Sequence, residues 1–276
     1  MRRVLTASLA LAALLAEPGS ARALPEELME ANRAYYLLSA HGVRGFQCDA
    51  SHNVLDEAYA AYAPDWGAQD PRIQVLGALR IQVRYTEAEG AVVEVAGVEP
   101  TGDPGFDQWL ESVLAQAKGL LRASLSVWAR YHARPLFDPA GTFRMEAFEG
   151  GLRVWYTTEE LEEVTVRLDE QHRVIEELRH TPKAVTKRVP VFVKSPQGWV
   201  ISTLGIDISP VMDKPVRHVV LYRYETVAGA RLPSRIRDQQ TLPQSAVWEV
   251  GLSNCRLTEE SGLKRIDLPS LPRRPL

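Results

Sequence analysis

The spacing of apolar residues is helical in two segments of the N-terminal half and alternating over most of the rest. Repeats of three and four residues predict an amphipathic helix over Pro25–Ala40. The same spacing predicts a longer helical stretch over Pro104–Tyr131, in which Gly119 is a candidate break between two helices. Both segments therefore have a wide apolar face that must be buried against another element.

Alternating patterns predict strands in the remaining segments. Residues Gly45–Ala50 read as a short strand with Phe46, Cys48 and Ala50 facing inward, and a brief helix is expected over Val54–Tyr62. Residues Leu79–Val98 read as a hairpin. Nine further strands follow, separated by turn residues: Thr142–Glu149, Leu152–Thr157, Glu163–Asp169, Val174–His180, Arg188–Lys194, Trp199–Leu204, Val216–Thr226, Arg231–Gln239 and Ala246–Leu257.

Short links between these strands favour an antiparallel meander. A sheet of about a dozen strands curls because of its twist. We therefore predict an α+β fold, in which a strongly curved antiparallel sheet forms an open, incomplete β-barrel. The two amphipathic helices are expected to cover its concave face as a lid. Such a lid over a curved sheet can enclose an apolar cavity.

The first 23 residues have the pattern of a secretory signal: Arg2 and Arg3, an apolar run, and small residues before a cleavage site after Ala23. The apolar run is too short for a permanent membrane anchor. We predict a periplasmic or secreted protein with a single domain over residues 24–267 and a flexible tail over 268–276. Removing three arginines and one glutamate changes the formal net charge from −3 to −5, which argues against a nucleic-acid partner.

The chain has two cysteines, Cys48 and Cys255, near opposite ends of the mature segment. An even count in an oxidising compartment favours a disulfide. If the sheet curls toward closure, the first and last strands become neighbours and the two Cα atoms should lie within about 7 Å. The alternative is two separate buried thiols that pack as small apolar groups.

Candidate chemistry is sparse. The six histidines show no metal-ligand spacing, and there is no nucleophile elbow, phosphate loop or dinucleotide fingerprint. We predict a protein that is not an enzyme and that needs no metal or cofactor. His218 reads as a core or rim histidine, and the acidic cluster of Glu159, Glu160, Glu162 and Glu163 reads as a solvated patch.

The aromatic residues are the strongest functional signal, because those on the long helix can meet those on the strands beneath it. Eight residues are candidates for lining a ligand cavity: Phe106, Trp109, Val113, Trp128, Tyr85, Tyr156, Tyr222 and Trp248. The alternative is that these side chains simply form the core.

The order of elements resembles that of the periplasmic outer-membrane lipoprotein carrier and sorting superfamily. The most specific likeness is the hairpin Leu221-Tyr222-Arg223-Tyr224-Glu225-Thr226-Val227-Ala228-Gly229-Ala230-Arg231-Leu232-Pro233-Ser234-Arg235-Ile236. The resemblance implies a half-barrel with a helical lid that carries acyl chains without catalysis. We therefore expect an exported protein that binds a lipid, a lipoprotein acyl chain or another apolar ligand, with a membrane or lipoprotein partner. The alternative is an exported structural or interaction protein with a filled core.

Overall fold

A computed structural model describes residues 24–158 and 161–258. The expected signal segment, its cleavage site and the C-terminal tail lie outside these residues. Most of the described chain forms one antiparallel sheet of 12 strands, in the order β3-β2-β1-β12-β11-β10-β9-β8-β7-β6-β5-β4. The sheet is open, with β3 and β4 as its end strands, so the predicted α+β fold with an unclosed antiparallel sheet is confirmed.

The strands of the C-terminal half follow the predicted alternation and pair in chain order. Their bounds are β4 Arg144–Phe148, β5 Gly151–Thr157, β6 Glu163–Asp169, β7 Val174–His180, β8 Ala184–Ser195, β9 Gly198–Pro210, β10 Val216–Val227, β11 Ala230–Leu242 and β12 Ala246–Thr258. The N-terminal strands are β1 Gly45–His52, β2 Arg80–Thr86 and β3 Gly90–Ala96. Because β1 pairs with β12, the first and last strands meet in the interior of the sheet.

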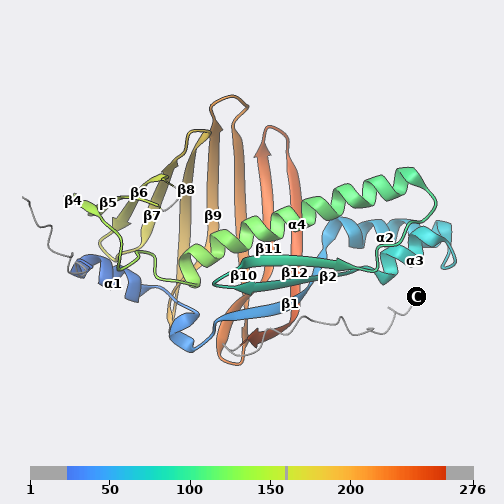
Figure 1. Cartoon of the computed structure of the whole chain (residues 1–276), viewed down its shortest axis with the longest axis horizontal. Helices are drawn as coiled ribbons and strands as arrows, with labels where there is room; N and C mark the ends of the chain where they lie inside the picture. The colour runs from blue at the N-terminus through green and yellow to red at the C-terminus, as the bar shows by residue number, and fades with distance from the viewer. Residues whose placement is uncertain (1–23, 159–160, 259–276) are drawn as a thin grey trace, which may run out of the picture.

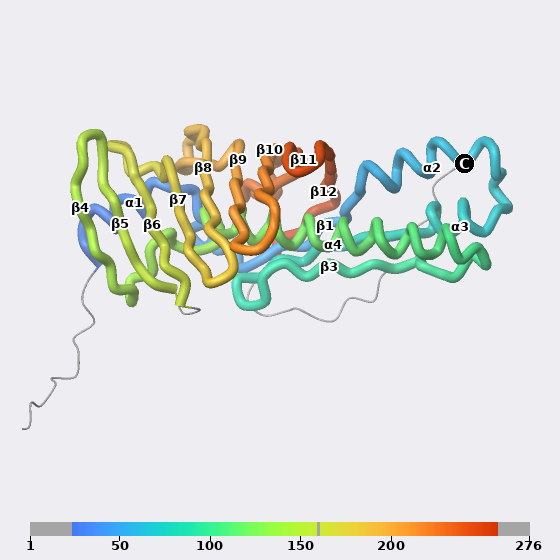
Figure 2. Tube along the Cα trace, turned by 90° about the horizontal axis from the view of Figure 1, so that it is seen from above, coloured from blue at the N-terminus to red at the C-terminus, as the bar shows by residue number. Residues whose placement is uncertain are grey.

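The helix α4 (Pro104–His132) lies across the inner face of the sheet (Figure 1). Seen from above, β4 to β12 follow an arc, and β3 returns on the other side of α4 (Figure 2). Both β3 and β9 contact α4, so the sheet curves around the helix. The predicted helical lid is therefore present, and it is held from two sides.

Local sequence explains where α4 begins and why it continues. The Asp103 carboxylate accepts hydrogen bonds from the backbone N–H groups of Gly105 and Phe106, and Pro104 occupies the first turn. The expected break at Gly119 is wrong: α4 is one helix of 29 residues. A glycine costs a helix only about 1 kcal/mol, and burial of the apolar stripe on both sides of Gly119 outweighs this cost.

The other helices differ from their predicted bounds. Helix α1 (Glu26–Ala34) is shorter than expected, because Tyr35 is extended and forms a parallel bridge with Trp199. Helix α2 (Asn53–Trp66) runs past Pro64, and the unpredicted α3 (Pro71–Ala78) begins at the N-cap Asp70. Together with the first half of α4, these two helices extend beyond the sheet (Figure 1). Among the described residues, no helix has the length and apolar character needed to span a membrane.

The predicted disulfide between Cys48 and Cys255 is confirmed, with the two Cα atoms 4.1 Å apart. Its geometric reason differs from the expected one. Strands β1 and β12 are neighbours because the N-terminal strands extend the sheet beside β12, whereas the sheet does not close. A stable disulfide is typical of proteins outside the reducing cytoplasm, so the bond indicates a non-cytoplasmic protein.

Candidate ligand-binding site

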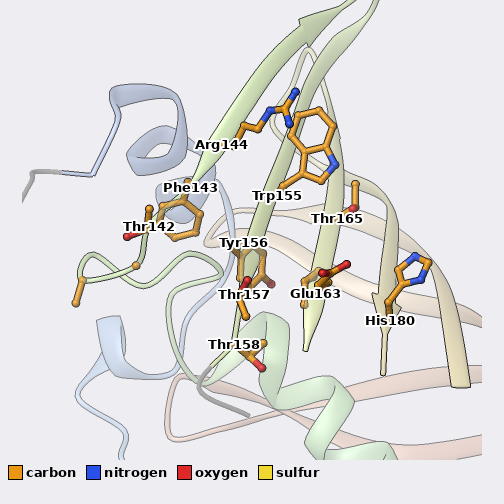
Figure 3. Close-up of a pocket in the computed structure, with 13 residues that line it drawn as sticks. Thr142, Phe143, Arg144, Trp155, Tyr156, Thr157, Thr158, Glu163, Thr165 and His180 are labelled. Atoms are coloured by element: carbon orange, nitrogen blue, oxygen red, sulfur yellow. The ribbon is translucent and has the colours of Figure 1, made fainter. Parts of the chain in front are cut away.

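A pocket of about 770 Å3 lies beside the start of β4 and the end of β5, near the end strand of the sheet (Figure 3). Arg144 is the first residue of β4 and pairs with Trp155 of β5. Before Arg144 the chain turns away, and the side chain and carbonyl of Asp138 accept hydrogen bonds from the backbone N–H groups of Ala140 and Gly141. Because β4 begins to pair only at Arg144, β5 has no β4 partner beyond Trp155, and the pocket lies in this space.

The pocket also exposes part of the backbone edge of β5. The two-residue turn at Glu149 and Gly150 makes Phe148 and Gly151 a hydrogen-bonded pair, and in an antiparallel ladder such pairs recur at every second residue. On β5, the backbone N–H and C=O groups of Gly151, Arg153 and Trp155 therefore point toward β4. Those of Thr157, two residues further along, point toward the same edge. Strand β4 does not extend that far, so these groups are directed into the pocket.

One wall of the pocket is aromatic and lies on the inner side of the sheet. Phe143 and Tyr156 contact each other with their ring centroids 5.6 Å apart, and Phe137 packs against both rings. Val164, which pairs with Tyr156 from β6, is buried beside them. This wall offers apolar surface to a ligand.

The outer side of the pocket has two rows of cross-strand neighbours, one with an arginine and the other with a glutamate. Arg144, Trp155 and Thr165 lie side by side on three neighbouring strands. Residues paired directly across strands share one face of a sheet. One step along the strands, Thr157 pairs with Glu163, which pairs with His180. Arg144 therefore lies at one end of the pocket, and Glu163 and His180 lie at the other (Figure 3).

The indole of Trp155 is flanked by two guanidinium groups. The Cζ of Arg144 lies 4.9 Å from the ring centroid, and that of Arg153 lies 5.6 Å from it. Arg153 also lies 5.9 Å from the ring of Phe148, and Arg167 lies 4.9 Å from that same ring. These cation–π contacts orient the arginines over the outer face of the sheet.

Behind the aromatic wall, three arginines surround the fully buried Glu177. Its carboxylate accepts hydrogen bonds from Arg179 and Arg188, each at 2.8 Å, and from Arg130 at 3.4 Å. Burial alone would raise the pKa of this carboxyl. The three positive charges outweigh that effect and lower the pKa to about 2. Glu177 is therefore ionised at every physiological pH.

This ionic cluster holds the aromatic wall in place. Arg130 comes from the last turn of α4 and donates a short hydrogen bond to the hydroxyl of Tyr156 and another to the carbonyl of Leu136. Burial raises the pKa of Tyr156, so the hydroxyl stays protonated. Since α4, β5 and β7 all contribute to the cluster, the position of Tyr156 depends on the docking of the helix.

The structure separates the eight candidate cavity residues. Trp128 and Tyr85 lie in the packed core with ring centroids 6.1 Å apart, and the buried hydroxyl of Tyr222 donates to the carbonyl of Ser124. Val113 is buried on α4, while Phe106 and Trp109 contact each other near the start of that helix. Trp248 is half-buried on β12 opposite Asp238. Only Tyr156 lines the pocket.

Sequence reasoning missed the other pocket residues. The available signal was the spacing of Arg153 and Trp155, two residues apart in a strand and so on the same face, although only Trp155 lines the pocket. Phe143 and the pocket threonines belong to no recognisable motif.

His218 and part of the predicted acidic patch lie outside the pocket. The imidazole Nδ1 of the half-buried His218 is 3.0 Å from the Asp238 carboxylate, and Glu162 pairs with Arg179. Glu159 and Glu160 lie outside the described residues.

Comparisons with models of protein families, with curated proteins and with solved structures find no match to this chain. Within residues 24–158 and 161–258, no group of three or more His, Cys, Asp or Glu side chains is placed to hold a metal ion. The assignment of function therefore depends on the pocket itself.

Proposed function

We propose that this chain is an exported, non-enzymatic protein that binds an amphipathic ligand such as a lipid or a lipoprotein acyl chain in the pocket beside β5. The observation that carries the proposal is the aromatic wall of Phe143 and Tyr156, held in place by Arg130. The pocket volume of about 770 Å3 is typical of sites for small ligands. The disulfide supports a location outside the cytoplasm.

Binding would follow from burial of apolar surface against the preformed wall. Removing apolar surface from water contributes about 25 cal/mol per Å2, so an acyl chain gains several kcal/mol from a few hundred Å2. The wall is already ordered by the Arg130–Tyr156 hydrogen bond, which lowers the entropy cost of binding. The threonine hydroxyls, and the backbone groups of Thr157 that no β4 residue pairs with, would satisfy polar atoms of the ligand.

Filling the pocket tests the proposal. Thr157 is exposed and lines the pocket, so Thr157→Trp should lower the affinity for a fluorescent fatty acid at least tenfold without loss of stability. Thr226→Trp is the matched control, because Thr226 is also exposed near the end of a strand, β10, and lies outside the pocket. Equal affinities of both variants and the unmodified protein would place the ligand elsewhere.

A second candidate is an exported structural or interaction protein without a ligand. The observation in its favour is the packing of the lid. Trp128 is fully buried, and Tyr85 and Tyr222 are nearly so, which means that these side chains serve as core. Native mass spectrometry separates the two candidates. A bare mass after gentle purification, with no uptake of fatty acid, would support the structural protein.

A further inference from the structure

We infer that the ligand has an anionic headgroup, held by Arg144 and Arg153 around the indole of Trp155. This inference rests on the proposed function, because it concerns the headgroup of the ligand in the same pocket. The two guanidinium groups lie 4.9 Å and 5.6 Å from the centre of the indole ring. Their orientation is therefore set before a ligand arrives.

Arg144 and Arg153 differ from most neighbouring arginines in having no carboxylate partner within the described parts of the chain. Arg167 pairs with Glu176, Arg173 with Asp169, and Arg179 with Glu162 and Glu177. Glu146 is the cross-strand neighbour of Arg153, yet no ion pair joins them. Arg144 lines the pocket, and Arg153 lies beside the pocket residue Trp155, just outside the lining. Both cations are thus available to an anion bound next to the indole.

The charged residues at the two ends of the pocket determine the orientation of the bound ligand. Glu163 at the opposite end of the pocket repels an anion, whereas Arg144 attracts one. The apolar part of the ligand then lies against Phe143, Tyr156 and Val164, between these two ends. Guanidinium groups bind carboxylates and phosphates with paired hydrogen bonds, so both headgroup chemistries fit.

The test compares three ligands of equal chain length: a monoalkyl phosphate, a fatty acid and a neutral monoacylglycerol. Affinities are measured by isothermal titration on the unmodified, disulfide-bonded protein. We expect the two anionic ligands to bind about tenfold more tightly than the neutral one, with a preference that falls at high salt. A larger preference for the phosphate would identify a phospholipid-type headgroup, and a larger preference for the fatty acid a free carboxylate.

The variant Arg144→Gln combined with Arg153→Gln should abolish the preference for anions and leave binding of the neutral ligand unchanged. Arg223→Gln combined with Arg237→Gln, at exposed positions on β10 and β11 outside the pocket, is the charge-matched control and should keep the preference. Equal affinity of the unmodified protein for all three ligands, or a preference that survives in the double variant, would overturn the anionic headgroup. Failure of all three ligands to bind would overturn the proposed pocket, which is a different result.

Discussion

Glu177 shows how one side chain can depend wholly on its neighbours. A buried carboxylate is tolerated only when opposite charges and hydrogen bonds replace its hydration. Here β7 supplies Arg179, β8 supplies Arg188 and α4 supplies Arg130. The residue therefore links the helix to the sheet through charge in addition to apolar contact.

Replacing Glu177 by glutamine tests this link. Removing the charge leaves buried guanidinium groups uncompensated, so Glu177→Gln should lower the free energy of unfolding by about 3–5 kcal/mol. Urea denaturation measures the loss. Glu163→Gln, at an exposed position, is the matched control and should change stability by less than about 0.5 kcal/mol. Similar small losses in both variants would contradict the structural role of Glu177.

The same carboxylate predicts a dependence of stability on pH. Its pKa is lowered from 4.5 to about 2 in the folded protein, so the unfolded chain takes up a proton first as the pH falls. The stability contributed by Glu177 is complete above about pH 5 and is lost between about pH 4.5 and pH 2. Its size is of the order of 3 kcal/mol. The free energy of unfolding, measured as a function of pH, should fall less between about pH 4.5 and pH 2 in Glu177→Gln than in the unmodified protein. Identical pH profiles of the two proteins would contradict this contribution of Glu177.

At the scale of the element, α4 is stabilised mainly by tertiary contacts. Gly119 lies in its middle, and an added Cβ there would meet no atom within 4 Å. Gly119→Ala should therefore raise the free energy of unfolding by about 0.5–1 kcal/mol, because alanine loses less backbone entropy in a helix. Thermal unfolding followed by circular dichroism checks this. A lower melting temperature would mean that the helix needs flexibility at this point.

The two tryptophans of α4 should differ in their effects on stability. Trp128 is fully buried between Phe46 and Tyr85, whereas Trp109 is half-buried near the outer end of the helix. Trp128→Ala should cost about 3–5 kcal/mol, and Trp109→Ala clearly less, because less of its surface is removed from water. Chemical denaturation of both variants provides the comparison. An equal or larger loss for Trp109→Ala would place the structural centre of the lid at its outer end.

At the scale of the whole molecule, the disulfide joins the N-terminal and C-terminal parts of the sheet. It links residues separated by 207 positions, so its loss releases a very long loop. The double variant Cys48→Ser with Cys255→Ser should lose about 4–5 kcal/mol on the chain-entropy account. Denaturation with and without reductant measures this, and the double variant itself should be insensitive to reductant. Unchanged stability would mean that β1 and β12 need no covalent link.

The sequence alone determined the period of each segment, and with it most of the strands, the long helix and the antiparallel meander. These features depend on which residues alternate over a few positions, so local pattern suffices. The disulfide between Cys48 and Cys255 was also predicted correctly from the sequence. The candidate break at Gly119 did not occur and the helix at Pro71–Ala78 was missed, because packing against distant elements overrides weak local signals.

Only the tertiary structure decided how β1 and β12 become neighbours without closure of the sheet, and where the pocket lies. The position of β1 beside β12 is a non-local pairing that no local period encodes. The pocket depends on where β4 begins to pair with β5, and the cluster around Glu177 depends on side chains from α4, β7 and β8 meeting in three dimensions. The candidate cavity residues on α4 and its facing strands were separated for the same reason. A periodic sequence specifies which face is apolar, whereas the packing of whole elements determines what covers that face.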